Sequence, residues 1–107
     1  MSDWWEVARA EEIPPGTVVQ VDADDTPIAV VNLDGTFFAL SNICTHMQVE
    51  LHDGELDPEG ELECPAHGAR FDVRTGEALT PPAFEGLDTY PVQVADGTVY
   101  VHPEPAD

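Results

Sequence analysis

The sequence predicts an all-β domain of short antiparallel strands, in which a second, smaller group of strands is inserted into a larger base. Runs rich in β-branched residues at 17–21 and 27–33 are typical of strands. Asp34-Gly35 and Asp96-Gly97 each separate two such runs, and this dipeptide between apolar runs is a strong hairpin signal. Between the two hairpins, glycine and proline recur too often for a helix longer than a turn or two.

The elements are expected in the following order. A first strand covers residues 4–8, and a turn at residues 11–16 ends it. Further strands of the base are predicted at residues 17–21, 27–33, 36–40, 92–94 and 98–101, and strands of the insertion at residues 55–56, 61–64, 71–73 and 77–79. We expect one domain over residues 1–107, with a base from about 1–42 and 85–107 and an inserted subdomain from about 43–84.

The charge of the chain limits its partners. Twenty-two acidic residues face only three arginines, and the formal net charge is −19. Such a surface repels nucleic acid and anionic membranes, whereas it suits a protein with a basic docking face. We expect Arg70 and Arg74 to pair with nearby carboxylates such as Asp72 or Glu77.

Residues 1–12 do not resemble a signal peptide, and no stretch approaches the roughly 20 apolar residues that a membrane span needs. We therefore expect a cytoplasmic protein that binds neither nucleic acid nor membrane.

Two short motifs carry the chemistry: Cys44-Thr45-His46 and Cys64-Pro65-Ala66-His67. Each of the two cysteines in the chain is followed within three residues by a histidine. Two thiolates and two imidazoles are the ligands of a 2Fe-2S cluster in which histidines replace two cysteines on one iron. A structural zinc ion is an alternative, but its common spacings group cysteine with cysteine and histidine with histidine. A disulfide between Cys44 and Cys64 is a further alternative, although nothing at the N-terminus suggests export.

The spacing of these motifs, C-x-H, seventeen residues and C-x-x-H, resembles that of Rieske proteins. The likeness continues with Gly68, with Phe71 to Gly76, and with Pro81-Pro82-Ala83. The chain resembles a Rieske-type 2Fe-2S ferredoxin, such as the ferredoxin component of bacterial aromatic-ring-hydroxylating dioxygenase systems.

This resemblance implies a Rieske-like fold, in which the inserted subdomain binds one 2Fe-2S cluster. Cys44 and Cys64 would bind one iron, and His46 and His67 the other. High-potential members of the family carry a serine and a tyrosine whose hydroxyls donate hydrogen bonds to sulfur, at the positions of Ala69 and Phe71. Neither side chain here can donate. We therefore expect a reduction potential near the low end of the Rieske range, about −150 mV.

The resemblance also implies a one-electron carrier and not an enzyme. Such a ferredoxin accepts electrons from a flavoprotein NAD(P)H-dependent reductase and passes them to a terminal oxygenase in aromatic hydrocarbon catabolism. A monomer would suit this role. Two alternatives stay open from the sequence: a small Rieske subunit of the NAD(P)H nitrite reductase system, and a redox-sensing or binding module.

Overall fold

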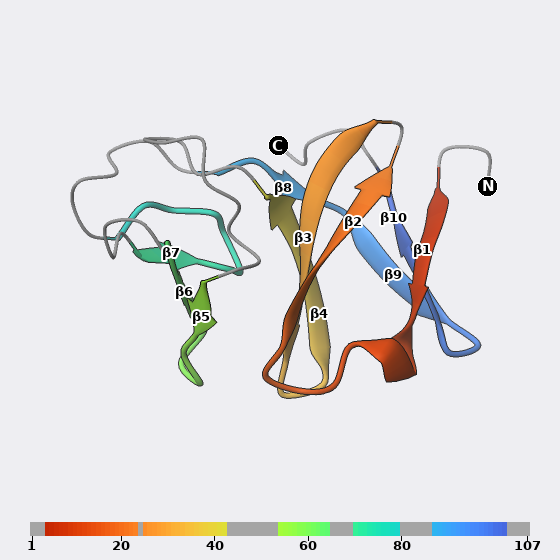
Figure 1. The fold of residues 1–107 in the computed structure, drawn as a ribbon, viewed down its shortest axis with the longest axis horizontal. Helices are drawn as coiled ribbons and strands as arrows, with labels where there is room; N and C mark the ends of the chain where they lie inside the picture. Colours follow the sequence, from red (N-terminus) through yellow and green to blue (C-terminus); the bar gives the residue numbers. More distant parts are fainter. Residues whose placement is uncertain (1–3, 24, 43–53, 65–69, 80–86, 103–107) are drawn as a thin grey trace.

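The computed structural model describes residues 4–23, 25–42, 54–64, 70–79 and 87–102. These residues form three antiparallel sheets and one short 3-10 helix, η1 (Ala10–Glu12), which confirms the predicted all-β class (Figure 1). No helix in these described segments has the length and apolar character that crossing a membrane requires.

We name the three sheets by their place in the molecule. The end sheet has the order β1-β10-β9, with β1 (Trp5–Arg9), β9 (Val92–Ala95) and β10 (Thr98–Val101). The central sheet has the order β2-β3-β4-β8, with β2 (Val18–Ala23), β3 (Thr26–Leu33), β4 (Thr36–Ser41) and β8 (Thr89–Tyr90). The small sheet has the order β5-β6-β7, with β5 (Glu55–Leu56), β6 (Glu61–Glu63) and β7 (Arg70–Asp72).

Both predicted Asp-Gly hairpins are present. Asp34 and Gly35 have φ angles of 52° and 94°, and Asp96 and Gly97 have φ angles of 53° and 76°. Two successive positive φ angles define the type I′ turn, whose twist matches that of the flanking strands. The hairpins lie in different sheets, because β3–β4 belongs to the central sheet and β9–β10 to the end sheet.

Strand β3 of the central sheet is buried on both faces. Ile28, Ala29, Val30 and Val31 of β3 all have an exposed fraction of 0%. Ile28 and Val30 belong to one buried cluster with side chains of the end sheet, such as Val99 and Val101. Ala29 and Val31 belong to a second cluster with side chains of the small sheet, such as Leu62 and Phe71.

Strand alternation therefore directs successive β3 residues into two different cores. The three sheets form successive layers, with the small sheet and the end sheet on opposite sides of the central one (Figure 1).

Some boundaries differ from those predicted. The strand expected at residues 71–73 is β7 and begins at Arg70, and the strand expected at residues 77–79 is reduced to one bridge between Ala78 and Phe71. Gly76, with a φ angle of 79°, turns the chain between these two segments. The two-residue strand β8 was not predicted, because its pairing with Ala39 and Leu40 of β4 depends on contacts distant in sequence.

Candidate cluster-binding site

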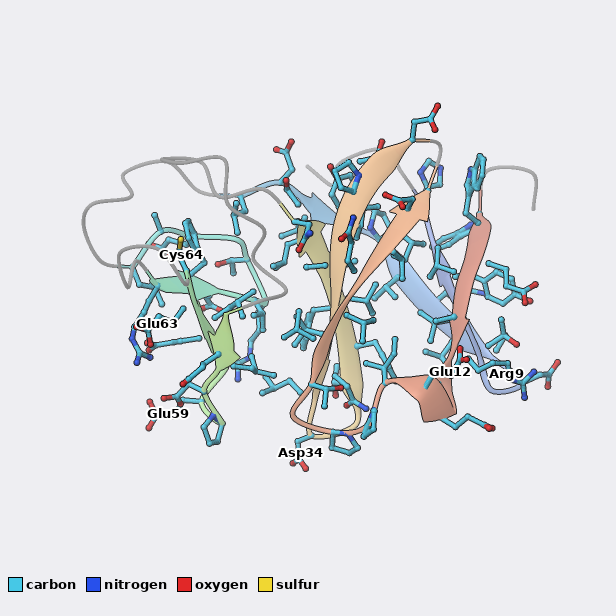
Figure 2. The ribbon with its side chains drawn as sticks, in the orientation of Figure 1. Arg9, Glu12, Asp34, Glu59, Glu63 and Cys64 are labelled. Atoms are coloured by element: carbon cyan, nitrogen blue, oxygen red, sulfur yellow. The ribbon has the colours of Figure 1, made fainter. Side chains whose placement is uncertain are left out.

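Of the four predicted ligands, Cys64 lies within the described residues. It directly follows β6 and is only 1% exposed. Figure 2 shows it at one end of the small sheet, whereas Glu59 lies at the opposite end. Cys44, His46 and His67 lie outside the described residues, as does the Pro81-Pro82-Ala83 segment.

The surroundings of Cys64 are apolar. Its buried cluster includes Leu62, Phe71 and Val73, each with an exposed fraction of 0%, and Leu87 at 6%. Thiolate sulfur is a soft ligand of the kind that iron–sulfur clusters use, and an apolar shell limits the access of water to it. The described part of the site therefore fits a sulfur-ligated cluster.

Strands β6 and β7 flank the second motif, which lies in the segment that connects them. Glu63, the last residue of β6, is the Cα partner of Arg70, the first residue of β7. Residues 64–69, which include two of the four predicted ligands, therefore begin and end at neighbouring positions of the small sheet.

The segments that flank residues 80–86 are also held at this sheet. The backbone N–H of Leu79 donates to the Arg70 carbonyl at 2.8 Å, and that of Leu87 donates to the Gly76 carbonyl at 2.6 Å. A Cβ atom on Gly76 would collide with the Leu87 carbonyl oxygen. The approach of these two segments thus requires glycine at position 76.

Arg70 joins three carboxylates beside the site. Its guanidinium lies 3.2 Å from Glu61 Oε1, 3.3 Å from Glu63 Oε1 and 3.6 Å from Asp57 Oδ2. The hydrogen bond to Glu61 is the main cause that raises the pKa of Arg70 above its ordinary value. Arg70 therefore remains a fixed positive charge among carboxylates.

Only part of this ion pairing was expected. Arg74 lies 3.6 Å from Asp72, which confirms one predicted pair. The partners of Arg70 come instead from β6 and from Asp57, which directly follows β5, and they were missed because the strand register was not known. The alternation of Glu61 and Glu63 around Leu62 was the available signal.

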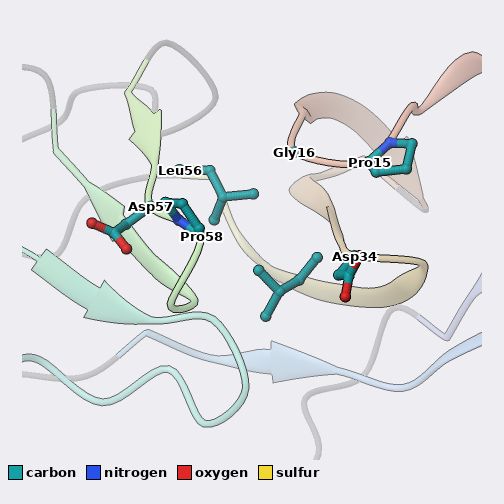
Figure 3. A pocket seen from close by; sticks show the side chains of 7 residues that line it. Pro15, Gly16, Asp34, Leu56, Asp57 and Pro58 are labelled. Carbon is teal, nitrogen blue, oxygen red and sulfur yellow. The ribbon is translucent and has the colours of Figure 1, made fainter.

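A separate hollow of about 370 Å³ lies between the small sheet and two turns of the base (Figure 3). It is lined by Pro15, Gly16, Leu33, Asp34, Leu56, Asp57 and Pro58. Figure 2 shows Asp34 at the lower edge of the molecule, away from Cys64. This hollow is therefore not part of the cluster-binding site.

Comparison with known proteins identifies the family of this chain. The model of the Rieske [2Fe-2S] domain family matches residues 3–91. The 3-phenylpropionate/cinnamic acid dioxygenase ferredoxin subunit of Photorhabdus laumondii is 43% identical, over 89% of this chain and 90% of its own. The ferredoxin component of the naphthalene 1,2-dioxygenase/salicylate 5-hydroxylase systems of a Ralstonia species is 38% identical, over 95% of this chain and 97% of its own.

Among solved structures, a complex of reduced oxygenase and oxidised ferredoxin in carbazole 1,9a-dioxygenase contains a chain with a TM-score of 0.93 and 34% identity, covering 100% of this chain and 99% of that one. The family match implies one Rieske-type 2Fe-2S cluster, which distinguishes this site from a zinc site. The chain belongs to the Rieske [2Fe-2S] family and, within it, to the ferredoxin components of aromatic dioxygenase systems, which are electron carriers and not catalytic subunits.

Proposed function

We propose that the protein carries single electrons from a flavoprotein NAD(P)H-dependent reductase to the terminal oxygenase of an aromatic-ring-hydroxylating dioxygenase. The observation that carries this proposal is the end-to-end similarity to ferredoxin components of such systems, together with the oxygenase–ferredoxin complex formed by a structural relative. We propose further that it acts as a monomer in the cytoplasm. Its net charge of −19 favours a role away from nucleic acid and anionic membranes.

Cys44 and Cys64 would bind one iron of the cluster, and His46 and His67 the other. The burial of Cys64 at the end of β6 supports this assignment. When bound, such a cluster supplies reversible one-electron transfer at a potential above that of all-cysteine plant-type ferredoxins.

The protein's own residues hold this site on the base. Leu62 and Phe71 pack with Val31 of β3 in one buried cluster, so the small sheet is fixed to the central sheet. The proposed division, with a cluster-binding subdomain at about residues 43–84 and a base at about 1–42 and 85–107, is supported by the position of β5, β6 and β7 between β4 and β8 in the chain.

The test begins with an electron paramagnetic resonance spectrum of the dithionite-reduced protein. We expect a rhombic signal with an average g-value below that of all-cysteine ferredoxins. Cys64→Ser and His67→Ala, each replacing one proposed ligand, should lose it, whereas His102→Ala on the base should retain it.

The second step is reconstitution with a flavoprotein reductase, a terminal oxygenase and an aromatic hydrocarbon. Hydroxylation should depend on the ferredoxin, and catalytic amounts should suffice because the carrier turns over. A ferredoxin that shows the signal but only forms a stable complex, without supporting turnover, would instead be a redox-sensing module.

A further inference from the structure

The outward face of the small sheet is charged, whereas its inward face is apolar. Leu56, Leu62 and Phe71 point toward the central sheet and pack in its core. Because successive side chains of a strand point to opposite faces, their neighbours in sequence point outward. Figure 2 shows Glu63 on the side of the small sheet that faces away from the central sheet.

The strand register groups these outward residues in two rows. In one row, Glu55 of β5 lies opposite Glu63 of β6, which in turn lies opposite Arg70 of β7. In the other row, Glu61 of β6 lies opposite Asp72 of β7. The bridge between Phe71 and Ala78 places Leu79 beside Arg70 and Glu77 beside Asp72. We define the acidic face by these outward residues: Glu55, Glu61, Glu63, Asp72 and Glu77, with Arg70 and Leu79 among them.

The acidic face is ordered and accessible. The ion pairs of Arg70 hold Glu61 and Glu63 in place, yet these two side chains keep exposed fractions of 34% and 38%. Leu79, which lies among these charged groups, is 40% exposed. Glu55, Glu63 and Arg70 also border a hollow of about 200 Å³ on this face. Ordered charges of one sign around an accessible apolar side chain can steer and orient a partner of the opposite charge.

The acidic face also lies next to the cluster-binding site. Glu63 directly precedes Cys64, and Arg70 begins the strand that follows the second motif. The Cys64 side chain points to the opposite, inward face, so only the small sheet would separate a partner on this face from a cluster ligand.

We propose that the acidic face docks a basic surface of the electron acceptor, the terminal oxygenase, with Leu79 as the apolar contact. This inference rests on the proposed function, because it assigns a surface to one partner of the carrier. The carboxylates would attract the partner, and the guanidinium of Arg70 would help to fix its orientation.

The charge of the redox states favours the acceptor over the donor. One added electron makes the reduced ferredoxin more negative beside the acidic face. A basic partner on this face therefore binds the reduced ferredoxin more tightly than the oxidised one. An acceptor needs this order of affinities, since it must bind the reduced carrier and release the oxidised one. A donor needs the reverse.

The test compares two variants with the same change in net charge. Glu55→Gln/Glu77→Gln removes two exposed carboxylates of the acidic face for which no ion pair is seen in the described structure. Glu6→Gln/Glu11→Gln removes two exposed carboxylates of β1 and η1, beyond the central sheet. Both are loaded with cluster, reduced, and mixed by stopped flow with cytochrome c, a basic one-electron acceptor used as the probe.

At low ionic strength, the second-order rate constant of Glu55→Gln/Glu77→Gln should fall about fivefold, as expected for two exposed ion pairs. The control variant should change less than about twofold, and the difference should vanish at high salt. Leu79→Ser should lower the rate about threefold at every ionic strength, because an apolar contact is not screened. Equal losses in the two charge variants, or none in the first, would overturn the proposal.

The direction of transfer is tested with a flavoprotein dioxygenase reductase as donor. Glu55→Gln/Glu77→Gln should be reduced at the wild-type rate, and a comparable loss in this step would refute the assignment to the acceptor. Cytochrome c accepts electrons whatever the physiological acceptor is. If the wild-type ferredoxin failed to support oxygenase turnover while the effect of Glu55→Gln/Glu77→Gln on cytochrome c persisted, the result would count against the proposed function and not against the docking surface.

Discussion

Phe71 shows how one side chain links the core to the redox chemistry. It has no exposed surface and shares its buried cluster with Cys64. Family members of high potential carry a tyrosine at this position, and its hydroxyl donates a hydrogen bond to sulfur. The buried phenyl ring of Phe71 has no such donor.

Phe71→Tyr should raise the reduction potential by about 40 mV. A hydrogen bond that stabilises the reduced state by about 1 kcal/mol produces a shift of this size in a one-electron couple. The measurement is a redox titration followed by visible absorbance. Phe37→Tyr, which alters the core on the other face of the central sheet, is the control and should leave the potential unchanged.

Tyr90 is a second residue whose environment alters its chemistry. Burial, and to a lesser extent the charge of Asp88, raise its pKa above the ordinary value for tyrosine. The folded state therefore favours the neutral phenol, and this contribution to stability is complete below about pH 10, the pKa of unfolded tyrosine. It is lost as the pH rises from there through the higher pKa of the folded state.

Tyr90→Phe should therefore remove part of the alkaline loss of stability. The measurement is the free energy of unfolding between about pH 8 and 11, obtained from urea titrations. Tyr100→Phe, on a partly exposed strand position, controls for the loss of a hydroxyl. If both variants followed the wild-type pH dependence, burial of Tyr90 would not contribute to alkaline unfolding.

At the scale of elements, the sequence predicts tight turns correctly, but it does not predict pairing between strands that are distant in the chain. The Asp34-Gly35 and Asp96-Gly97 hairpins follow from two residues each, because their positive φ angles favour these residue types. By contrast, β8 exists only because Thr89 and Tyr90 meet β4, and nothing in their own sequence specifies that pairing. The contact of Gly76 with Leu87 was equally hidden, since eleven positions separate the two residues.

Gly76→Ala should destabilise the fold by more than about 2 kcal/mol. The substitution combines a positive φ angle with a collision against the Leu87 carbonyl. Gly35→Ala is the matched control, because its φ angle is 94° but no atom lies within 4 Å of the added Cβ, so backbone strain of about 1 kcal/mol remains. Denaturant midpoints of the two variants give the comparison, and equal midpoints would show that the collision is relieved by movement.

For the whole molecule, the sequence predicted a base with an insertion but not how the two are joined. The uninterrupted apolar run from Ile28 to Val31 was assigned to a strand without specifying what its faces contact. In the structure this run belongs to two cores at once, so the small sheet is attached along a face of the central sheet. The four ligands were predicted from their spacing alone, and only the setting of Cys64 adds structural support.

Val31→Ala and Val30→Ala test this arrangement from adjacent positions of β3. Each removes two methyl groups from a site with no exposed surface, and each should lower the free energy of unfolding by about 2 kcal/mol. Only Val31→Ala weakens the core shared with Cys64, so it should lose the cluster faster when an iron chelator is added. Equal rates of bleaching for the two variants would mean that the two cores respond as one unit.

Because both faces of β3 are buried, the small sheet and the rest of the protein cannot be separated without exposing apolar side chains. Excising the small sheet would leave Ala29, Val31 and Leu40 uncovered on the remaining base. The excised piece, in turn, would expose Leu62 and Phe71. Neither half is a self-sufficient module, so the cluster-binding part cannot be grafted onto another scaffold unless that scaffold offers an apolar sheet face in place of β3 and β4.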